Sequence, residues 1–264
     1  MCRLLAVIDT KDKPRTLKAL REFRDLAEYG RISKGWSIGH KDGWGLVGYG
    51  KGRIVAFEKY PNDAFYDMRY ETATAKLLKK KPKVVIGHLR KAAVGTNTME
   101  NTHPFRHGNI SLCHNGVVID YKKLPLKPRF KKLIRGTTDT EPFFAYVLQL
   151  FHERGGSTKL TTSGKNKENF RAALLDAIQF VHKNCDYTAM NLIVSDGRML
   201  YILFDANTKN AMVKKRRLEG YYGPYKGFDK KGKLILVVSE KLPIKDITWK
   251  PFRNREMLEV DMYV

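Results

Sequence analysis

The chain has 264 residues, with 50 lysines and arginines against 27 aspartates and glutamates, and its formal net charge is +23 at pH 7. Its 42% content of hydrophobic residues is that of a globular protein, which excludes a disordered chain. No stretch approaches the roughly 18 uninterrupted apolar residues that a membrane helix needs, so we expect no membrane span.

The first residues, MCRLLAVIDT, include Arg3 among the apolar positions and Asp9 directly after them. This arrangement is unlike a secretory signal peptide. The cysteines, Cys2, Cys113 and Cys185, are irregularly spaced and form no CxxC pattern. We therefore expect neither a disulfide framework nor a metal site, and a reduced, cytoplasmic protein.

The basic residues gather in clusters at 78–83, 121–132, 213–217 and 229–233. These clusters are scattered over connecting segments, and no RRM, KH or helix-turn-helix signature accompanies them. They predict a solvated basic surface, and nucleic-acid binding is not expected as the main function. The only glutamines are Gln149 and Gln179, which together with the many basic residues suggests a thermophilic source.

Hydrophobic periodicity and turn signals predict the secondary structure. In chain order we expect a strand at 2–8, a helix at 14–30, strands at 44–50 and 53–60, a helix at 68–81, strands at 83–90 and 109–119, a helix at 138–154, a polar loop at 155–168, a helix at 169–184, and strands at 188–196, 199–205 and 233–240. Thr138 and Glu141 have the spacing of a capping box. Strands and helices are segregated and do not alternate, which favours an α+β fold of antiparallel sheets layered with helices in the order helix, sheet, sheet, helix.

Four stretches could carry chemistry: Cys2, GHLRKAAVG (87–95), ENTHPF with CHNG (100–105 and 113–116), and GTTDTE (136–141). Each has an ordinary structural interpretation when it is taken alone. A cysteine is usually a small buried hydrophobe, and an Asn-Gly pair usually marks a hairpin, although apolar residues on both sides of it would also fit a continuous strand. An arginine after a strand usually forms a surface ion pair, an aspartate often begins a helix, and a histidine can be purely structural.

Taken together, the stretches suggest acyl transfer by an N-terminal nucleophile. If Met1 is removed, Cys2 carries both a thiol and a free α-amine, whose ordinary pKa of about 7.7–8.0 allows it to act as a general base. The Asn115 side-chain amide and the Gly116 N–H could stabilise the oxyanion.

The remaining charged groups fit the ends of an α-amino acid. Arg90 offers a planar fork for a carboxylate, and Asp139 could bind an ammonium group. An α-amino acid with an acyl group on its side chain points to glutamine as the substrate.

The motifs MC, GHLRKAAVG, ENTHPF, HNG and TDTE, in this order, resemble those of the class II glutamine amidotransferase domain, an N-terminal-nucleophile hydrolase. With GHKDGWG at 39–45, the chain is most similar to the stand-alone YafJ-like branch. The resemblance implies one domain over residues 2–264 and a four-layer αββα sandwich of two antiparallel sheets. It also implies the following roles: Cys2 as nucleophile, Asn115 and Gly116 as the oxyanion hole, Arg90 and Asp139 as ligands of the glutamine α-carboxylate and α-amino group, and His103 as a residue that shapes the pocket.

The resemblance further implies hydrolysis of glutamine or of a γ-glutamyl amide or peptide through a γ-glutamyl thioester, without a cofactor. Many members carry Thr or Ser and then His where Ala93 and Val94 stand here, so a hydroxyl contact to the substrate carboxylate is lost. We expect no fused synthase domain, so the ammonia would pass to a separate subunit or be released. The alternative is a non-catalytic binding protein of the same fold that uses its basic surface to hold nucleic acid or an acidic partner.

Overall fold

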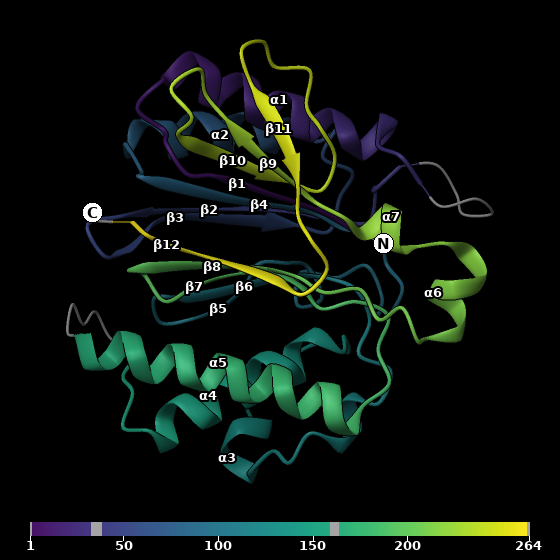
Figure 1. Ribbon diagram of the computed structural model, residues 1–264. Helices are drawn as coiled ribbons and strands as arrows, with labels where there is room; N and C mark the ends of the chain where they lie inside the picture. Colours follow the sequence, from purple (N-terminus) through teal and green to yellow (C-terminus); the bar gives the residue numbers. More distant parts are fainter. Residues whose placement is uncertain (1, 33–38, 159–163, 263–264) are drawn as a thin grey trace.

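The computed structural model describes residues 2–32, 39–158 and 164–262. Two antiparallel sheets are stacked face to face, with helices α1 (Lys13–Tyr29) and α2 (Met68–Lys79) above one sheet and α4 (Thr140–Glu153) and α5 (Gly164–Asn184) below the other (Figure 1). The predicted helix, sheet, sheet, helix order is therefore confirmed.

The upper sheet has the strand order β11-β9-β10-β1-β4-β2-β3. Its members are β1 (Arg3–Val7), β2 (Trp44–Gly50), β3 (Arg53–Tyr60), β4 (Val84–Leu89), β9 (Tyr225–Phe228), β10 (Leu234–Val238) and β11 (Thr248–Pro251). β1 lies in the interior of this sheet, paired with β10 on one side and β4 on the other. All of its residues are buried, and this pairing holds the start of the chain in place.

The lower sheet has the order β12-β8-β7-β6-β5. Its members are β5 (Phe105–His107), β6 (Ile110–Asn115), β7 (Asn191–Ser195), β8 (Met199–Phe204) and β12 (Glu256–Asp261). The pairing of β6 with β7 places Asn115 opposite Asn191, at the ends of both strands. One end of this sheet therefore presents the residues that follow β6 and precede β7.

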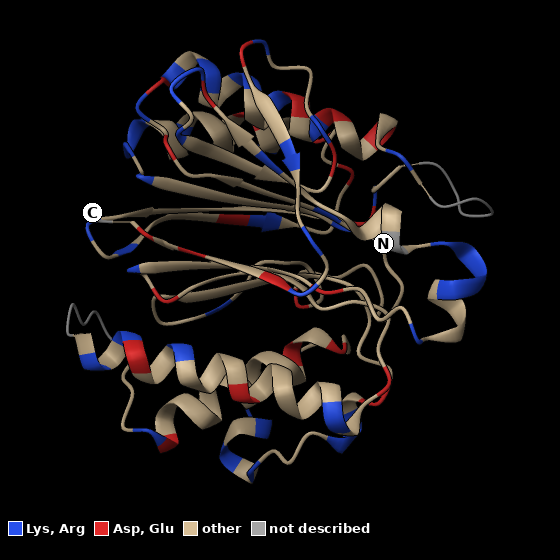
Figure 2. Cartoon of the chain, in the orientation of Figure 1, with Lys and Arg blue, Asp and Glu red and all other residues tan. Residues whose placement is uncertain are grey.

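Buried apolar residues form a cluster between the sheets and further clusters under each helical layer. α1 shows why these helices dock: Thr16, Leu20, Phe23 and Ala27 recur at helical spacing and are buried against the upper sheet. Its start is fixed by the Asp12 side chain, which accepts from the Arg15 N–H. Most lysines and arginines lie on the outer helices and connections, and the facing strands carry few of them (Figure 2).

Several sequence predictions need correction. The expected strand over 109–119 ends at Asn115, because the chain turns after this residue to run beside 186–188. α5 begins at Gly164, so the predicted loop at 155–168 is wrong for its last five positions, and 159–163 lie outside the described residues. The short β5, β9, β11 and β12 were missed, as were the helices η1 (Tyr121–Lys123), α3 (Pro128–Lys131), α6 (Ala211–Arg216) and α7 (Glu219–Tyr222).

Only one of the two hydrogen bonds of the predicted capping box at α4 forms. The Thr138 hydroxyl accepts from the Glu141 N–H at 3.4 Å, as expected. The Glu141 carboxylate, however, accepts from the Gly136 N–H at 2.7 Å and does not return to Thr138. In the parts of the chain that are described, no helix combines the length and the hydropathy that crossing a bilayer would require.

Candidate functional site

Cys2 directly precedes β1 and is buried, at the same end of the sandwich as the end of β6. Its backbone nitrogen donates to Oδ1 of Asn115 at 2.9 Å. Its Sγ lies 3.4 Å from the backbone nitrogen of Lys91 and 3.6 Å from the Lys91 carbonyl oxygen. The two sheets therefore meet at Cys2, since β1 belongs to one and Asn115 to the other.

The hydrogen bond from Cys2 defines the orientation of the Asn115 amide. In this structure the Cys2 nitrogen is a peptide N–H, which can only donate, so the oxygen of the amide must face it and the NH₂ group must point away. Nδ2 of Asn115 is buried and has no hydrogen-bond partner among the described residues. A buried donor without a partner is costly, and such exceptions in folded proteins call for an explanation, which a charge that develops during a reaction would supply.

Gly116 follows Asn115 and lines the same small cavity as Cys2. A Cβ at this position would lie 1.9 Å from the Ala189 carbonyl oxygen and 2.8 Å from Nε2 of His114. Only glycine therefore fits between the end of β6 and the segment that leads into β7. This close approach is what the Asn-Gly pair encodes here, in place of a hairpin turn.

Arg90 follows β4 and is buried, with a relative exposure of 2%. Its guanidinium donates to the carbonyl oxygens of Val94 and Gly95 and to Oδ1 of Asn97, at 2.9–3.1 Å. The loop after β4 thus folds back over its own arginine. A carboxylate ligand of Arg90 would compete with these acceptors for the guanidinium.

Asp42 stabilises the same loop from the other side. Its carboxylate accepts from the Ala92 N–H at 2.8 Å and from Nδ2 of Asn97 at 3.2 Å. The sequence predicted no role for Asp42, although this residue lies in the segment GHKDGWG. An aspartate directly before Gly43 and the buried strand that begins at Trp44 was the available signal.

Asp139 is buried at the beginning of α4, and its Oδ2 accepts from the Val118 N–H at 2.7 Å. Burial raises the pKa of this carboxyl group, while the neighbouring His114 opposes the shift. Nδ1 of His114 lies 3.9 Å from Oδ2 of Asp139 and 2.9 Å from Oγ1 of Thr140, and its Nε2 lies 3.0 Å from the Ala189 carbonyl oxygen. His114 therefore connects Asp139 to the segment that packs on Gly116.

His103 lines the cavity on the side of the cis His103–Pro104 bond and stacks on His88, with ring centroids 4.2 Å apart. Burial lowers the pKa of His88 to about 3 and that of His103 well below its usual value, so both rings are neutral at pH 7. Neither nitrogen of His103 has a hydrogen-bond partner in the described part of the chain. His103 thus contributes an uncharged, polar side chain to the lining of the cavity.

The structure brings all six predicted residues to one place. Cys2, Arg90, His103, Gly116 and Asp139 line the cavity, and Asn115 bonds to Cys2. The cavity has a volume of about 30 Å³, which is room for about two water molecules. Among the described residues, no group of three or more His, Cys, Asp or Glu side chains is arranged to hold a metal ion.

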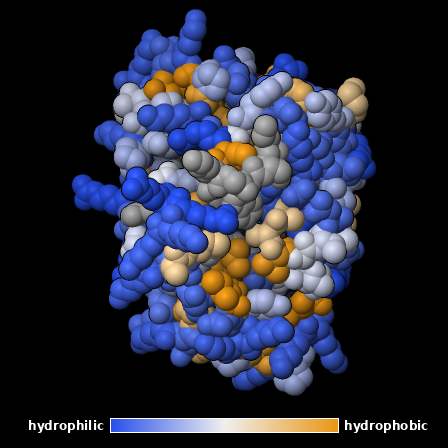
Figure 3. Space-filling view, turned by 90° about the vertical axis from the view of Figure 1, so that its right-hand side faces the viewer, coloured by the Kyte–Doolittle hydropathy of each residue, from blue (hydrophilic) through white to orange (hydrophobic). Residues whose placement is uncertain are grey.

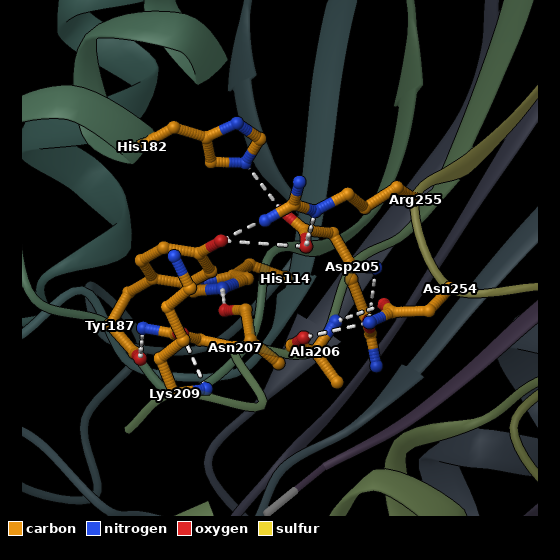
Figure 4. Close-up of polar contacts among 11 residues, drawn as sticks. His114, His182, Tyr187, Asp205, Ala206, Asn207, Lys209, Asn254 and Arg255 are labelled. Atoms are coloured by element: carbon orange, nitrogen blue, oxygen red, sulfur yellow. Dashed lines mark hydrogen bonds and ion pairs between the residues drawn. The ribbon is translucent and has the colours of Figure 1, made fainter.

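A polar cluster that the sequence analysis missed supports this end of the lower sheet (Figure 4). Asp205, fully buried after β8, accepts from the Tyr187 hydroxyl at 3.2 Å and contacts Nε2 of His182 and, at 3.8 Å, Nε of Arg255. The backbone carbonyl of Asp205 also accepts from the Met190 N–H at 2.7 Å. The cluster holds residues 187–190, and thereby the Ala189 carbonyl that contacts both His114 and Gly116.

The site lies at the end of the molecule that carries the N-terminus, α6 and α7 (Figure 1). α7 is tied to this end because the Tyr222 carbonyl accepts from Nδ2 of Asn191 at 2.9 Å and the Arg3 guanidinium stacks on Tyr221. On the corresponding face, apolar residues gather near the middle and hydrophilic side chains surround them (Figure 3). This end of the molecule thus presents both apolar and hydrophilic surface.

Comparison with protein families gives a match to one described as "Glutamine amidotransferases class-II", over residues 1–223. An uncharacterized protein of Methanocaldococcus jannaschii is 26% identical over 98% of this chain and 68% of its own length. YafJ of Escherichia coli, whose name describes it as a glutamine amidotransferase, is 29% identical over 67% of this chain and 66% of its own length. The chain therefore spans about two thirds of the length of these two relatives.

Solved structures share the fold at low sequence identity. A glutamine phosphoribosylpyrophosphate amidotransferase from B. subtilis matches 99% of this chain and 47% of its own, with a TM-score of 0.61 and 15% identity. A glutamine aminotransferase class-II domain protein from Silicibacter pomeroyi matches 98% of this chain and 94% of its own, with a TM-score of 0.57 and 16% identity. The second match extends over nearly the whole of both chains.

Proposed function

Since this chain belongs to the class II glutamine amidotransferases, in their stand-alone, YafJ-like branch, we propose that it hydrolyses the side-chain amide of glutamine or of a γ-glutamyl compound with Cys2 as the nucleophile. The observation that carries the proposal is the 2.9 Å hydrogen bond from the Cys2 nitrogen to Oδ1 of Asn115. It joins the nucleophile and an oxyanion donor in one unit.

The first step needs a free Cys2 α-amine, which removal of Met1 would create. The amine accepts the thiol proton, and the thiolate attacks the side-chain carbonyl carbon, so that a C–S bond forms. The protonated amine then gives this proton to the leaving nitrogen as the C–N bond breaks. Ammonia or an amine departs, and a γ-glutamyl thioester remains on Cys2.

The second step repeats this chemistry with water. The α-amine takes a proton from water, the resulting hydroxide adds to the thioester carbonyl, and the C–S bond breaks to release the γ-carboxylate and the thiol. In both steps the carbonyl oxygen becomes negatively charged. Nδ2 of Asn115, which has no other partner in the described structure, and the Gly116 N–H are proposed to stabilise this charge.

Arg90 and Asp139 are proposed to bind the α-carboxylate and α-ammonium groups of the substrate. The 30 Å³ cavity is too small for glutamine, and the Arg90 guanidinium is occupied by its own loop. Binding would therefore require residues 91–97 to move outward, and the substrate carboxylate would compete with the Val94 and Gly95 carbonyls for the guanidinium. With Ala93 and Val94 in this loop, no side-chain hydroxyl there can assist Arg90.

The acceptor of the released nitrogen is proposed to be water or a separate ammonia-accepting subunit. A larger leaving group, as in a γ-glutamyl peptide, is compatible with the position of the site beside α7 and the mixed surface of this face. No cofactor enters any step of the proposed chemistry.

The test is glutamate release from glutamine and from a panel of γ-glutamyl amides and peptides, with protein whose loss of Met1 is established by intact mass. We expect turnover in the parent and none in Cys2→Ala. A matched variant with one lysine inserted between Met1 and Cys2 keeps the thiol but blocks the α-amine, and it should also be inactive.

Equal glutamate release by the parent and Cys2→Ala would refute the mechanism. Activity in the lysine-insertion variant would refute the role of the α-amine alone. No activity on any compound after confirmed Met1 removal, together with steeply salt-dependent binding of RNA, would favour the non-catalytic binding protein instead.

A further inference from the structure

A second cavity, with a volume of about 360 Å³, lies next to the Cys2 site but is separate from it. Its walls come from β3, β5, α4 and the segments around Glu100 and Arg135. The stretch 102–105 separates the two cavities, since His103 lines the Cys2 cavity and Phe105 lines the other. Its size falls within the range of roughly 300–1,000 Å³ that is typical of small-molecule sites.

Lys59 is unusual among the residues that line this cavity, because a lysine ammonium group is seldom removed from solvent. Its side chain is half-buried, and its Nζ donates to the Thr102 carbonyl oxygen at 2.6 Å and lies 5.4 Å from the centre of the Phe105 ring. No carboxylate in the described part of the chain lies within ion-pair distance of it. Burial lowers the pKa of this ammonium group to about 8.

The charges around Lys59 do not balance. Arg106, Lys132 and Arg135 also line the cavity, against the carboxylates of Glu100 and Glu141. None of these cations makes an ion pair with any described residue, and Glu141 is engaged by the Gly136 N–H at 2.7 Å. Four cations against two anions leave the cavity with an excess of positive charge beside a half-buried ammonium group.

The remaining wall is apolar. Phe57 and Phe105 stand on one side, and Phe144 and Leu148 of α4 stand on the other. Apolar walls with a few convergent charges are typical of sites that hold an organic molecule with one charged group. An anion at Lys59 would compensate the cost of burying the ammonium, and a planar or aliphatic body would cover the aromatic side chains.

We propose that this cavity is a binding site for a small organic anion, whose phosphate or carboxylate group contacts Lys59 and Arg135 and whose apolar body lies against Phe57, Phe105 and Phe144. The site is distinct from that of the proposed hydrolysis, because neither Cys2 nor Asn115 lines it.

The test uses calorimetric titration with phenyl phosphate and benzoate, which have the same ring and differ in the anionic group, and with benzyl alcohol as the neutral control. We expect saturable binding of phenyl phosphate, benzoate or both, and none of benzyl alcohol. Lys59→Met should weaken binding about ten- to a hundredfold, the effect of losing one charge-assisted hydrogen bond. Lys18→Met, at an exposed position of α1, should leave it unchanged.

A readout that does not depend on affinity is the pKa of Lys59, followed by NMR titration of the lysine side chains with and without phenyl phosphate. It should rise from about 8 when the anion is bound. If Lys59→Met fails to fold, Arg135→Gln at an exposed position serves as the second variant and should weaken binding in the same direction.

Several results would overturn the proposal: no saturable binding of either anion, equal binding of benzyl alcohol, or binding that Lys59→Met and Arg135→Gln leave unchanged. The last result would assign the binding to the general positive charge of the surface. Loss of glutamate release with intact anion binding would refute the proposed hydrolysis and leave this site standing, so the two failures are distinguishable.

Discussion

The backbone nitrogen of Cys2 donates a hydrogen bond to Oδ1 of Asn115 across 113 positions of sequence, from the start of a strand in one sheet to the end of a strand in the other. The bond orients the Asn115 amide so that its NH₂ group is left without a partner in the described structure. The same contact thus holds the proposed nucleophile and leaves a donor available at the site.

Replacement of Asn115 by Asp should separate these two roles. The aspartate keeps an oxygen to accept from the Cys2 nitrogen but has no NH₂ group to donate. We expect kcat for glutamine hydrolysis to fall by a factor of roughly 10²–10³ or more, the cost of removing one oxyanion donor, with little loss of thermal stability. Steady-state kinetics beside a melting curve measure both effects. An unchanged kcat would remove Asn115 from the oxyanion hole.

Gly116→Ala should damage both the fold and the activity. The new Cβ would overlap the Ala189 carbonyl oxygen at 1.9 Å, so the end of β6 or the segment before β7 must shift. We expect a loss of about 1–3 kcal/mol in the free energy of unfolding, measured in urea. Gly164→Ala is the matched control, because nothing lies within 4 Å of a Cβ there, and its stability should equal or exceed that of the parent. Equal stability of the two variants would contradict this account.

Asp205→Ala tests the cluster that supports the Ala189 segment. The substitution leaves the Tyr187 hydroxyl and the His182 ring without their acceptor. We expect the free energy of unfolding to fall by about 2–3 kcal/mol. Asp176→Asn, which breaks the surface pair between Asp176 of α5 and Arg154 at the end of α4, should change it by less than about 0.5 kcal/mol. Equal effects of the two variants in chemical denaturation would show that the cluster carries no special stability.

Lys59 predicts a pH dependence of stability with a definite sign. Its pKa is about 8 in the folded chain and about 10.4 when unfolded, so between these values the unfolded chain binds more protons. The parent should therefore gain stability relative to Lys59→Met as the pH rises from about 8 to about 10.4, by about 2–3 kcal/mol in total. Urea unfolding of both proteins across this range measures the difference. A difference that does not vary with pH would mean that the ammonium is not destabilised by burial.

Much of the fold follows from local patterns in the sequence. The strands at 44–50 and 53–60 and the helix at 14–30 have hydrophobic periods and turn signals that are strong without tertiary context, and they lie where expected. The short β5, β9 and β11 have three or four residues each, too few for any period to emerge. Their backbone pairs only because neighbouring strands are already in place.

For the site, the sequence by itself determined the residue types and their order: Cys2, Arg90, His103, Asn115, Gly116 and Asp139 carry the groups that acyl transfer on an amino acid needs. It also placed Arg90 at the end of a strand and Asp139 near the start of a helix, but it predicted Asn115 and Gly116 inside a strand that in the structure ends at Asn115. It could not show that Asp42 and His114 support the loops beneath them, or that Asp205 holds the Ala189 segment, because those roles depend on contacts between distant residues.

Only the tertiary structure decided which polar side chains have hydrogen-bond or ion-pair partners and which have none. It engages Arg90 with the carbonyls of its own loop and pairs Oδ1 of Asn115 with Cys2. It leaves Lys59 half-buried, with no carboxylate of the described residues within ion-pair distance. The physical reason is that a side chain's type is a local property, whereas its desolvation and its partners are set by segments that approach from elsewhere in the chain. The stacking of two sheets places Cys2 beside Asn115, and no local pattern contains that distance.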